Sequence, residues 1–456
     1  CVYFVFRTTH DHIRLDPHLH KKLRAVLCRL CLLLVQMTCF DDPHEVDEEY
    51  VTGSFFEEEI GSVDNSLLTS IPEGVKVVRV PFSFANGVPT TKLRSMSRLR
   101  ANFPQLWNRI LGATSHKYRD WLSILLGKSK ASYQMQDNYV TWIEPVVSAI
   151  SKVHTAKPID HILATGNPYS SFEAARISAG LASVPFSIDY RDPWMIDMRT
   201  EGPANLSPAT KLAEQRIVAE AASCFHVNHA IKDAYERLYP ESDHKHHVVL
   251  NGFDQSSVNQ VPAPYTGGPL RFGMLGTVTD LWPLSPIVEA WLQVRKDLPA
   301  GSELILGGHL GYFARNEAAL KSDLPGEGSG FRYVGPVAKD QVAEFYRDIN
   351  VVVVPAHGMA MVTTGKIFEA VGLGSPVICV QNLDGGAHEI VKEHPFGFSA
   401  APNGEAVERA FRAAIESTKS MTADQIADTR DRMAKFERPV AMKTMVGMVH
   451  ETTFGP

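Results

Sequence analysis

Two short, wholly apolar runs in the C-terminal half, Val351–Pro355 and Val377–Val380, are separated by a polar loop and a segment with helical spacing. Apolar runs rich in β-branched residues are typical of strands whose two faces are both covered, as in parallel sheets. The pattern therefore predicts a strand–helix–strand unit with both strands buried in a parallel sheet.

The same alternation of apolar runs and helical patterns recurs on both sides of a stretch rich in Pro, Gly and Ser, residues 255–268. Such a composition predicts a linker between domains. Alternating strands and helices are typical of parallel sheets covered by helices. The predicted strands are residues 30–38, 75–80, 161–165, 185–190, 224–228 and 247–250 before the linker, and 272–275, 303–306, 331–334, 351–355 and 377–380 after it.

We therefore expect an α/β protein with two Rossmann-like βαβ domains that face each other across a cleft. A chain of 456 residues is long enough to form two cores. The expected division is an N-terminal extension of unclear structure (1–29), an N-terminal domain (30–258), a linker (259–268), a C-terminal domain (269–437) and a C-terminal helix that packs back toward the N-terminal domain (438–456).

Residues 92–153 predict amphipathic helices, because Trp, Leu and Ile recur at helical spacing beside Arg and Lys. Basic, aromatic helices bind anionic membrane surfaces in some proteins and flank a sheet in others. Peripheral contact with a membrane surface is thus one of two open interpretations. The apolar run Leu30–Val35 is too short to span a bilayer.

Composition narrows the class of protein. The chain is 44% hydrophobic and 21% charged, as in soluble globular proteins, and its net charge of −6 argues against nucleic acid as a partner. Of the six cysteines only Cys28 and Cys31 are close together, and no second pair completes a zinc site. We therefore expect a reducing, cytoplasmic location.

The loop between the two opening strands carries candidate chemistry. Thr363 or Thr364 can cap the following helix, Gly365 permits close approach of a ligand, and Lys366 adds positive charge. The free N–H groups of a helix start attract anions such as a diphosphate. Glu369 follows within reach of hydroxyl groups beside such an anion. This order suggests a nucleotide sugar; the alternative is an ordinary crossover with surface Lys and Glu.

Other candidates follow predicted strands of the N-terminal domain. Arg191 and Asp192 come directly after one strand and are predicted to face the cleft, although a structural ion pair is nearly as plausible. Asn167 and Tyr169 follow the neighbouring strand and can hydrogen-bond a polar acceptor. The alternative for that loop is a turn built by Gly166, Asn167 and Pro168.

Several familiar motifs are absent from the sequence. No GxGxxG, Walker A lysine motif, HExxH, GxSxG or DxD occurs, so the chain offers no short carboxylate clamp for a divalent metal. His244, His246 and His247 are better interpreted as a solvated turn than as metal ligands. We therefore predict neither a metal site nor a cofactor.

Taken in order, a run of motifs resembles the GT-B glycosyltransferases, specifically the large retaining family four, over roughly residues 105–450. The segments that carry the resemblance are TGNPYSS (165–171), DYRDPW (189–194), NGFD (251–254), FGMLGT (272–277) and TGKIFEAVGLGSPVI (364–378).

The resemblance implies roles for individual residues. Glu369 would bind the ribose hydroxyls of a donor nucleotide, with the residues around its diphosphate being Gly276, Thr277, Thr364, Gly365 and Lys366. The acceptor side would be formed by Gly53, Asn167, Tyr169, Arg191 and Asp192, with Gly53 in a loop that leads into a short helix. Asp192 and Glu369 are the predicted catalytic residues.

The sequence departs from the family pattern at two places. Many members carry a Glu eight positions before Glu369, where this chain has Met361, and the usual Arg and Lys after the Gly276 strand are replaced by Thr277-Val278-Thr279-Asp280. Lys366 is the residue that would compensate for the missing positive charge.

The resemblance implies transfer of a sugar from a nucleotide-diphosphate donor to an acceptor hydroxyl, with retention and without a metal. The acceptor would be a glycan, a lipid-linked sugar or a small molecule, in bacterial surface polysaccharide synthesis at the inner face of the membrane. Two alternatives are a sugar-nucleotide epimerase of the same fold and a catalytically silent protein that binds sugar nucleotides.

Overall fold

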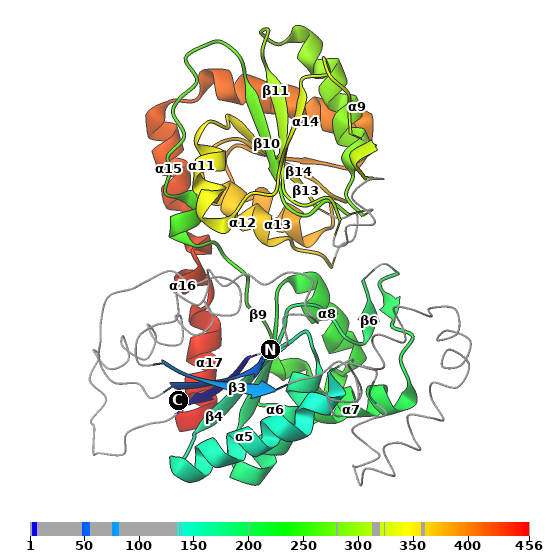
Figure 1. Cartoon of the computed structure of the whole chain (residues 1–456), viewed down its shortest axis with the longest axis vertical. Helices are drawn as coiled ribbons and strands as arrows, with labels where there is room; N and C mark the ends of the chain where they lie inside the picture. Colours follow the sequence, from blue (N-terminus) through cyan, green and yellow to red (C-terminus); the bar gives the residue numbers. More distant parts are fainter. Residues whose placement is uncertain are drawn as a thin grey trace, which may run out of the picture.

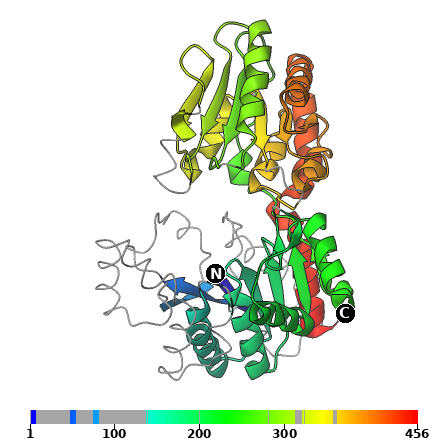
Figure 2. The same cartoon turned by 90° about the vertical axis from the view of Figure 1, so that its right-hand side faces the viewer.

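A computed structural model describes residues 2–6, 48–54, 75–81, 135, 137, 139–198, 200–279, 281–311, 320–322, 324–356 and 361–455. These residues form two α/β domains that follow one another along the long axis of the molecule (Figures 1 and 2). The expected fold class, two Rossmann-like domains in the GT-B arrangement, is therefore confirmed.

The C-terminal domain is built on a parallel sheet with the strand order β12-β11-β10-β13-β14-β15. Numbered along the domain, this is the order 3-2-1-4-5-6 of dinucleotide-binding folds, whose ligand site lies at the carboxyl ends of the two central strands. The strands are β10 (Arg271–Leu275), β11 (Glu303–Gly307), β12 (Phe331–Gly335), β13 (Val351–Pro355), β14 (Val377–Val380) and β15 (Gly397–Ala400).

Helices cover both faces of this sheet, as the apolar strands predicted. Along β13, Val351 and Val353 pack in one core with α9 and α14, whereas Val352 and Val354 pack in the other with α11, α12 and α13. The helices are α9 (Leu284–Val294), α11 (Val342–Arg347), α12 (Gly365–Gly372), α13 (Gly386–Val391), α14 (Gly404–Ser420) and α15 (Ala423–Met433).

The N-terminal domain has a seven-stranded sheet in the order β3-β2-β1-β4-β5-β8-β9. Strand β1 is antiparallel to both of its neighbours, and the other six strands share one direction. The strands are β1 (Val2–Phe6), β2 (Glu48–Ser54), β3 (Val75–Pro81), β4 (His161–Gly166), β5 (Phe186–Tyr190), β8 (Ser223–His226) and β9 (His246–Val248).

The helices around this sheet are α5 (Ile143–Ala156), α6 (Ser170–Ala182), α7 (Pro208–Glu220) and α8 (His229–Leu238), and a short hairpin is formed by β6 (Ile196–Asp197) and β7 (Gly202–Pro203). Both α7 and α8 have clear starts: Ser207 accepts a bond from the Thr210 N–H, and Asn228 from the Ile231 N–H. Among the described residues, no helix is long and apolar enough to cross a bilayer.

The first half of the N-terminal domain differs from the expectation. The expected extension contributes strand β1, and Val51–Ser54 lie in strand β2 rather than in a loop that enters a helix, so that prediction was wrong. Antiparallel pairing with β1 holds the Val51 segment in extended form. The strand expected at 30–38 and most of the basic helical stretch fall outside the described residues.

The chain crosses between the domains twice, and the two crossings lie side by side (Figure 1). After β9, the Phe253 N–H donates to the Phe436 carbonyl (3.0 Å), and the Arg438 N–H donates to the Phe253 carbonyl (2.8 Å). The returning segment continues as α16 (Arg438–Ala441) and α17 (Lys443–Phe454), which runs along the N-terminal domain. There the Thr453 hydroxyl lies 2.9 Å from His161 Nδ1.

Candidate donor and acceptor sites

The loop between β13 and α12 ends in a helix start with open space beside it. Thr364, rather than Thr363, is the cap: its side chain accepts a bond from the Lys366 N–H. A Cβ built on Gly365 would meet no atom of a described residue beyond its neighbours within 4 Å. The N-terminal dipole of α12 therefore points at a region that an anionic group can approach.

Lys366 and Glu369 form an ion pair on the first turns of α12, with Nζ and Oε2 2.7 Å apart. The Glu369 side chain is only 9% exposed, whereas that of Lys366 is 29% exposed. The second carboxylate oxygen of Glu369, Oε1, has no hydrogen-bond partner among the described residues. The pair thus keeps one acceptor and two ammonium hydrogens available for a ligand.

The Gly276–Thr277 loop lies at the same edge of the sheet, because β10 and β13 are parallel neighbours. The Gly276 N–H donates to the Gly307 carbonyl (3.0 Å), so it is not available to an anion. Gly308 must be glycine here, since its φ is +131° and a Cβ would lie 1.8 Å from the Gly276 oxygen. The Thr277 hydroxyl has no partner among the described side chains. It is therefore the group of this loop that can donate to an anion.

The same loop reaches the N-terminal domain. Asn228, at the carboxyl end of β8, donates from Nδ2 to the Met361 carbonyl (2.9 Å) and the Thr363 hydroxyl (3.0 Å). The Met361 side chain is buried in the core cluster of the N-terminal domain. Met361, the departure from the family pattern, is therefore an apolar contact between the domains.

Among the residues predicted for the acceptor side, Asn167 is exposed and its side chain has no partner among the described residues. Tyr169 is differently placed: its hydroxyl donates to the backbone carbonyls of Asp192 (3.2 Å) and Pro193 (3.0 Å), and its ring stacks on Trp194 at 4.8 Å. Tyr169 therefore holds the 191–194 turn, and its donor hydrogen is used within the protein.

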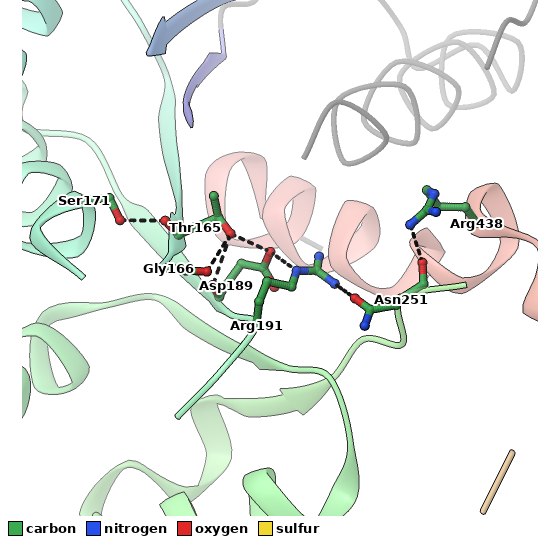
Figure 3. A network of polar contacts seen from close by, with 7 residues as sticks. All are labelled: Thr165, Gly166, Ser171, Asp189, Arg191, Asn251 and Arg438. Atoms are coloured by element: carbon green, nitrogen blue, oxygen red, sulfur yellow. Dashed lines mark hydrogen bonds and ion pairs between the residues drawn. The ribbon is translucent and has the colours of Figure 1, made fainter. Parts of the chain in front are cut away.

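Arg191 belongs to a network of polar side chains rather than standing free (Figure 3). Its Nε donates to Asp189 Oδ2 (2.7 Å) and its Nη1 to Asn251 Oδ1 (2.6 Å). Thr165 also donates to Asp189 Oδ2, and Arg438 donates to the Asn251 carbonyl at 2.7 Å. The network joins the ends of β4 and β5 to the two crossings between the domains.

This network is only partly satisfied. Nη2 of Arg191 and Oδ1 of Asp189 are buried and have no hydrogen-bond partner among the described residues. Burial raises the pKa of the Asp189 carboxyl, and the charge of Arg191 opposes that rise. Of the two sequence-based alternatives for Arg191, the geometry favours the structural ion pair.

Asp192 has an exposed side chain on the adjoining turn, although dense surrounding protein raises the pKa of its carboxyl against the opposing charge of Arg191. Gly53 lies near the end of β2, in register with Val80 of β3. Because β2, β4 and β5 run in the same direction, Gly53, Asn167 and Asp192 all lie at the carboxyl edge of the sheet; β4 and β5 are neighbours, and β1 lies between β2 and β4.

Two buried clusters escaped the sequence analysis. Glu214 is fully buried and accepts bonds from three tyrosine hydroxyls, those of Tyr190 (2.8 Å), Tyr235 (2.8 Å) and Tyr239 (3.0 Å). Burial raises the pKa of Glu214 to about 7, and the three tyrosine bonds oppose the rise. Tyr235 also accepts the Trp194 N–H at 2.8 Å, so this cluster supports the turn that carries Asp192.

The second cluster corrects the interpretation of the histidine-rich stretch. His246 starts strand β9, is buried, and lies 2.8 Å from His226 (Nδ1 to Nε2), so it is not part of a solvated turn. Burial lowers the pKa of His246 to about 4 and keeps the ring neutral. The signal in the sequence was the apolar run that follows the histidines, because strand β9 begins at His246, one residue before the predicted strand.

Comparison with known proteins agrees with this geometry. Residues 271–417 match the family model "Glycosyl transferases group 1". HepE of Anabaena, solved with UDP, is 16% identical, with 67% of this chain and 81% of that chain covered and a TM-score of 0.52. A glycosyltransferase of Rickettsia africae is 13% identical, covering 69% and 82%, with a TM-score of 0.55.

A third structure, the lipopolysaccharide outer core galactosyltransferase WaaB, is 13% identical, covers 85% of this chain and 86% of that chain, and has a TM-score of 0.50. At such identities the likeness concerns the fold. No curated protein matches the chain at a significant level. Residues 271–417 thus match a group 1 glycosyl transferase domain, and the chain as a whole has the two-domain GT-B fold of these glycosyltransferases.

Proposed function

We propose that the protein transfers a sugar from a uridine diphosphate sugar to an acceptor hydroxyl, with retention at the anomeric carbon and without a metal ion. The observation that carries the proposal is the start of α12, where the Thr364 cap and the open space at Gly365 adjoin the Lys366–Glu369 pair. An anion at the helix start and hydroxyls at Glu369 match a diphosphate and a ribose.

In this proposal Lys366 supplies the main stabilisation of negative charge on the leaving diphosphate. A departing nucleoside diphosphate gains negative charge, which a preorganised ammonium and helix dipole stabilise more strongly in the transition state than in the substrate. The Thr277 hydroxyl adds a hydrogen bond from the neighbouring strand end. With these groups the leaving diphosphate is neutralised by the chain itself.

The choice of uridine follows from HepE, which has been solved with UDP and with UDP-glucose. The acceptor is a hydroxyl of a glycan, a lipid-linked sugar or a small molecule, bound near Asn167 and Asp192. We further propose action in polysaccharide synthesis in the cytoplasm, at the inner face of the membrane. Co-sedimentation with anionic lipid vesicles tests the peripheral contact.

A thermal-shift screen with UDP, GDP, ADP and TDP sugars tests the donor assignment. We expect the largest rise in melting temperature with a UDP sugar, because binding to the native state stabilises it. Incubation with EDTA should leave turnover unchanged, and the product should keep the anomeric configuration of the donor. A shift with none of the nucleotides would overturn the donor site.

Incubation of the enzyme with donor alone separates transfer from the alternatives. An epimerase changes the sugar of the donor without any acceptor, whereas a transferase leaves it intact or hydrolyses it slowly. A silent binding protein would give the thermal shift with neither hydrolysis nor transfer.

A further inference from the structure

We propose that Asn228 is a positioning residue for sugar transfer: its buried side-chain amide holds, from the N-terminal domain, the loop that starts helix α12 of the C-terminal domain. The proposal rests on the proposed function of α12 as the donor-binding helix. It goes further, because it makes the geometry of the donor site depend on contact between the two domains.

The orientation of the Asn228 amide is fixed by its partners. Its Oδ1 accepts the Ile231 N–H at 2.8 Å as the cap of α8, so the NH₂ group must face the opposite way. There it donates to the Met361 carbonyl and to the Thr363 hydroxyl. Both hydrogens of the amide are therefore used across the domain boundary.

The held loop has a second support within its own domain. Gln381 Nε2 donates to the Val362 carbonyl (2.9 Å), and Gln381 Oε1 accepts the Ala387 N–H (3.0 Å). Consecutive carbonyls, those of Met361 and Val362, are thus fixed by side-chain amides from different domains. Of these two amide contacts, the one from Asn228 conveys the position of the N-terminal domain to the loop.

Close packing leaves this loop little freedom while the contact exists. A Cβ on Gly386 would lie 2.1 Å from the Thr363 hydroxyl oxygen and 3.1 Å from Asn228 Nδ2. Thr363 directly precedes Thr364, the cap of α12, so a shift at Thr363 moves the helix start. When the domains separate, the Met361 carbonyl loses its donor and the cap loses a fixed neighbour.

The position of Met361 supports the same conclusion independently. Its side chain packs with the core of the N-terminal domain, although its backbone belongs to the C-terminal domain. An apolar side chain buried across the boundary favours the joined arrangement, and the Asn228 amide sets the register of the contact. Together they link closure of the two domains to the form of the donor site.

The decisive variant is Asn228→Ser. Serine is a good helix cap, so α8 is retained, but its side chain is too short to reach Met361. We expect kcat/KM for the UDP sugar to fall roughly 10- to 100-fold, as for a buried carbonyl left without its donor. The KM for the donor should rise, and the KM for the acceptor should not change.

Thr363→Val removes only one of the two acceptors and should lower kcat/KM by roughly 2- to 5-fold. Added to Asn228→Ser it should have almost no further effect, because the shared contact is already lost. The matched control is Asn403→Ser, which makes the same substitution at the cap of α14, where Asn403 accepts the Ala406 N–H. It should leave kcat/KM unchanged.

Hydrogen exchange of the ligand-free protein gives a readout that does not depend on the donor. In Asn228→Ser we expect the amides of residues 362–367 to exchange roughly 10-fold faster, with those of α8 unchanged. Unchanged exchange at 362–367 would overturn the proposal, as would faster exchange with unaltered kcat/KM. If wild type turned over no UDP sugar, the proposed function would fail, and the exchange rates would still decide whether Asn228 holds the loop.

Discussion

The two domains use ion pairs in opposite ways. In the C-terminal domain, Lys366 and Glu369 meet on the helix between two wholly apolar strands, β13 and β14, and the Lys366 side chain is partly exposed. In the N-terminal domain, Asp189 and Arg191 have side chains only 1% and 14% exposed and are bound to Asn251 as well. The first pair is placed for binding and the second for holding the domain together.

The difference follows from what surrounds each pair. At the start of α12 the Glu369 carboxylate is largely buried, but the Lys366 side chain is 29% exposed, so its ammonium group remains accessible to a ligand. A pair taken out of water is stable only while both members and their hydrogen bonds are present. Substitutions in the two regions should therefore have different consequences, which four experiments can separate.

The largest effect is expected for Arg191→Met, which leaves the Asp189 carboxylate buried without its partner. The free energy of unfolding should fall by about 3–5 kcal/mol, measured by urea denaturation. Arg332→Met is the control, since Arg332 forms an exposed pair with Glu303 and its loss should cost less than about 1 kcal/mol. Equal stability of the two variants, with activity lost only at Arg191, would make Arg191 a ligand-binding residue instead.

The next largest effect is the pH dependence of the free energy of unfolding that we expect from Glu214. Its pKa is raised in the folded state, from 4.5 to about 7, so the folded protein binds a proton more tightly than the unfolded chain. The contribution of this proton to the free energy of unfolding is complete below pH 4.5 and is lost as the pH rises toward about 7. Unfolding free energies of wild type and Glu214→Gln should diverge by about 3 kcal/mol between pH 4.5 and pH 8.

The measurement compares the two proteins at each pH, so that contributions of other groups cancel. Gln stays neutral at every pH and can still accept from Tyr190 and Tyr235. A constant difference between wild type and variant over this range would show that Glu214 does not titrate there.

A smaller change in free energy is expected for Lys366→Met. The affinity for UDP should fall roughly 10- to 30-fold, about 1.5–2 kcal/mol, because a charge-assisted contact with the diphosphate is lost. The free energy of unfolding should also fall, by about 1–3 kcal/mol, because the largely buried Glu369 carboxylate loses its partner. Lys419→Met, which breaks the exposed pair with Glu416 at the same spacing, should alter neither quantity; isothermal titration with UDP measures the contrast.

The smallest effect is expected for Gly365→Ala, where the added methyl group meets no atom in the part of the chain that the structure describes. Stability should rise by a few tenths of a kcal/mol at most, while UDP binding weakens about 3-fold, because the methyl group occupies the approach to the helix start. Gly447→Ala, in open space on α17, should stabilise without affecting UDP. Equal UDP affinity in both variants would show that the diphosphate does not bind at the start of α12.

The same contrast explains what the sequence could and could not predict. The strands Val351–Pro355 and Val377–Val380 were predicted with the bounds that the structure has, because an unbroken apolar run has few alternatives in a covered sheet. The cap and the ion pair at the start of α12 have residues that are close in the chain, so their arrangement could be predicted, whereas binding of a donor there stays a prediction.

Contacts between distant residues left no local signal. Asn228 and Thr363 are 135 positions apart, and Arg191 and Asn251 are 60 apart, so neither pair follows from spacing. Strand β1 was missed because its position between β2 and β4 depends on antiparallel pairing with both, which a short apolar run does not specify. The contacts of the Tyr169 hydroxyl were not predicted either, because its backbone partners follow another strand.

The adjacent crossings between the domains at Phe253 and Glu437 have a consequence for engineering of the protein. The chain enters the C-terminal domain and leaves it at nearly the same point, so that domain is an insertion whose two ends adjoin. Such a domain can be replaced by a related one with few new junctions in the chain. If the proposed function holds, swapping this domain between relatives should change the donor while preserving the N-terminal domain and the α17 segment that packs on it.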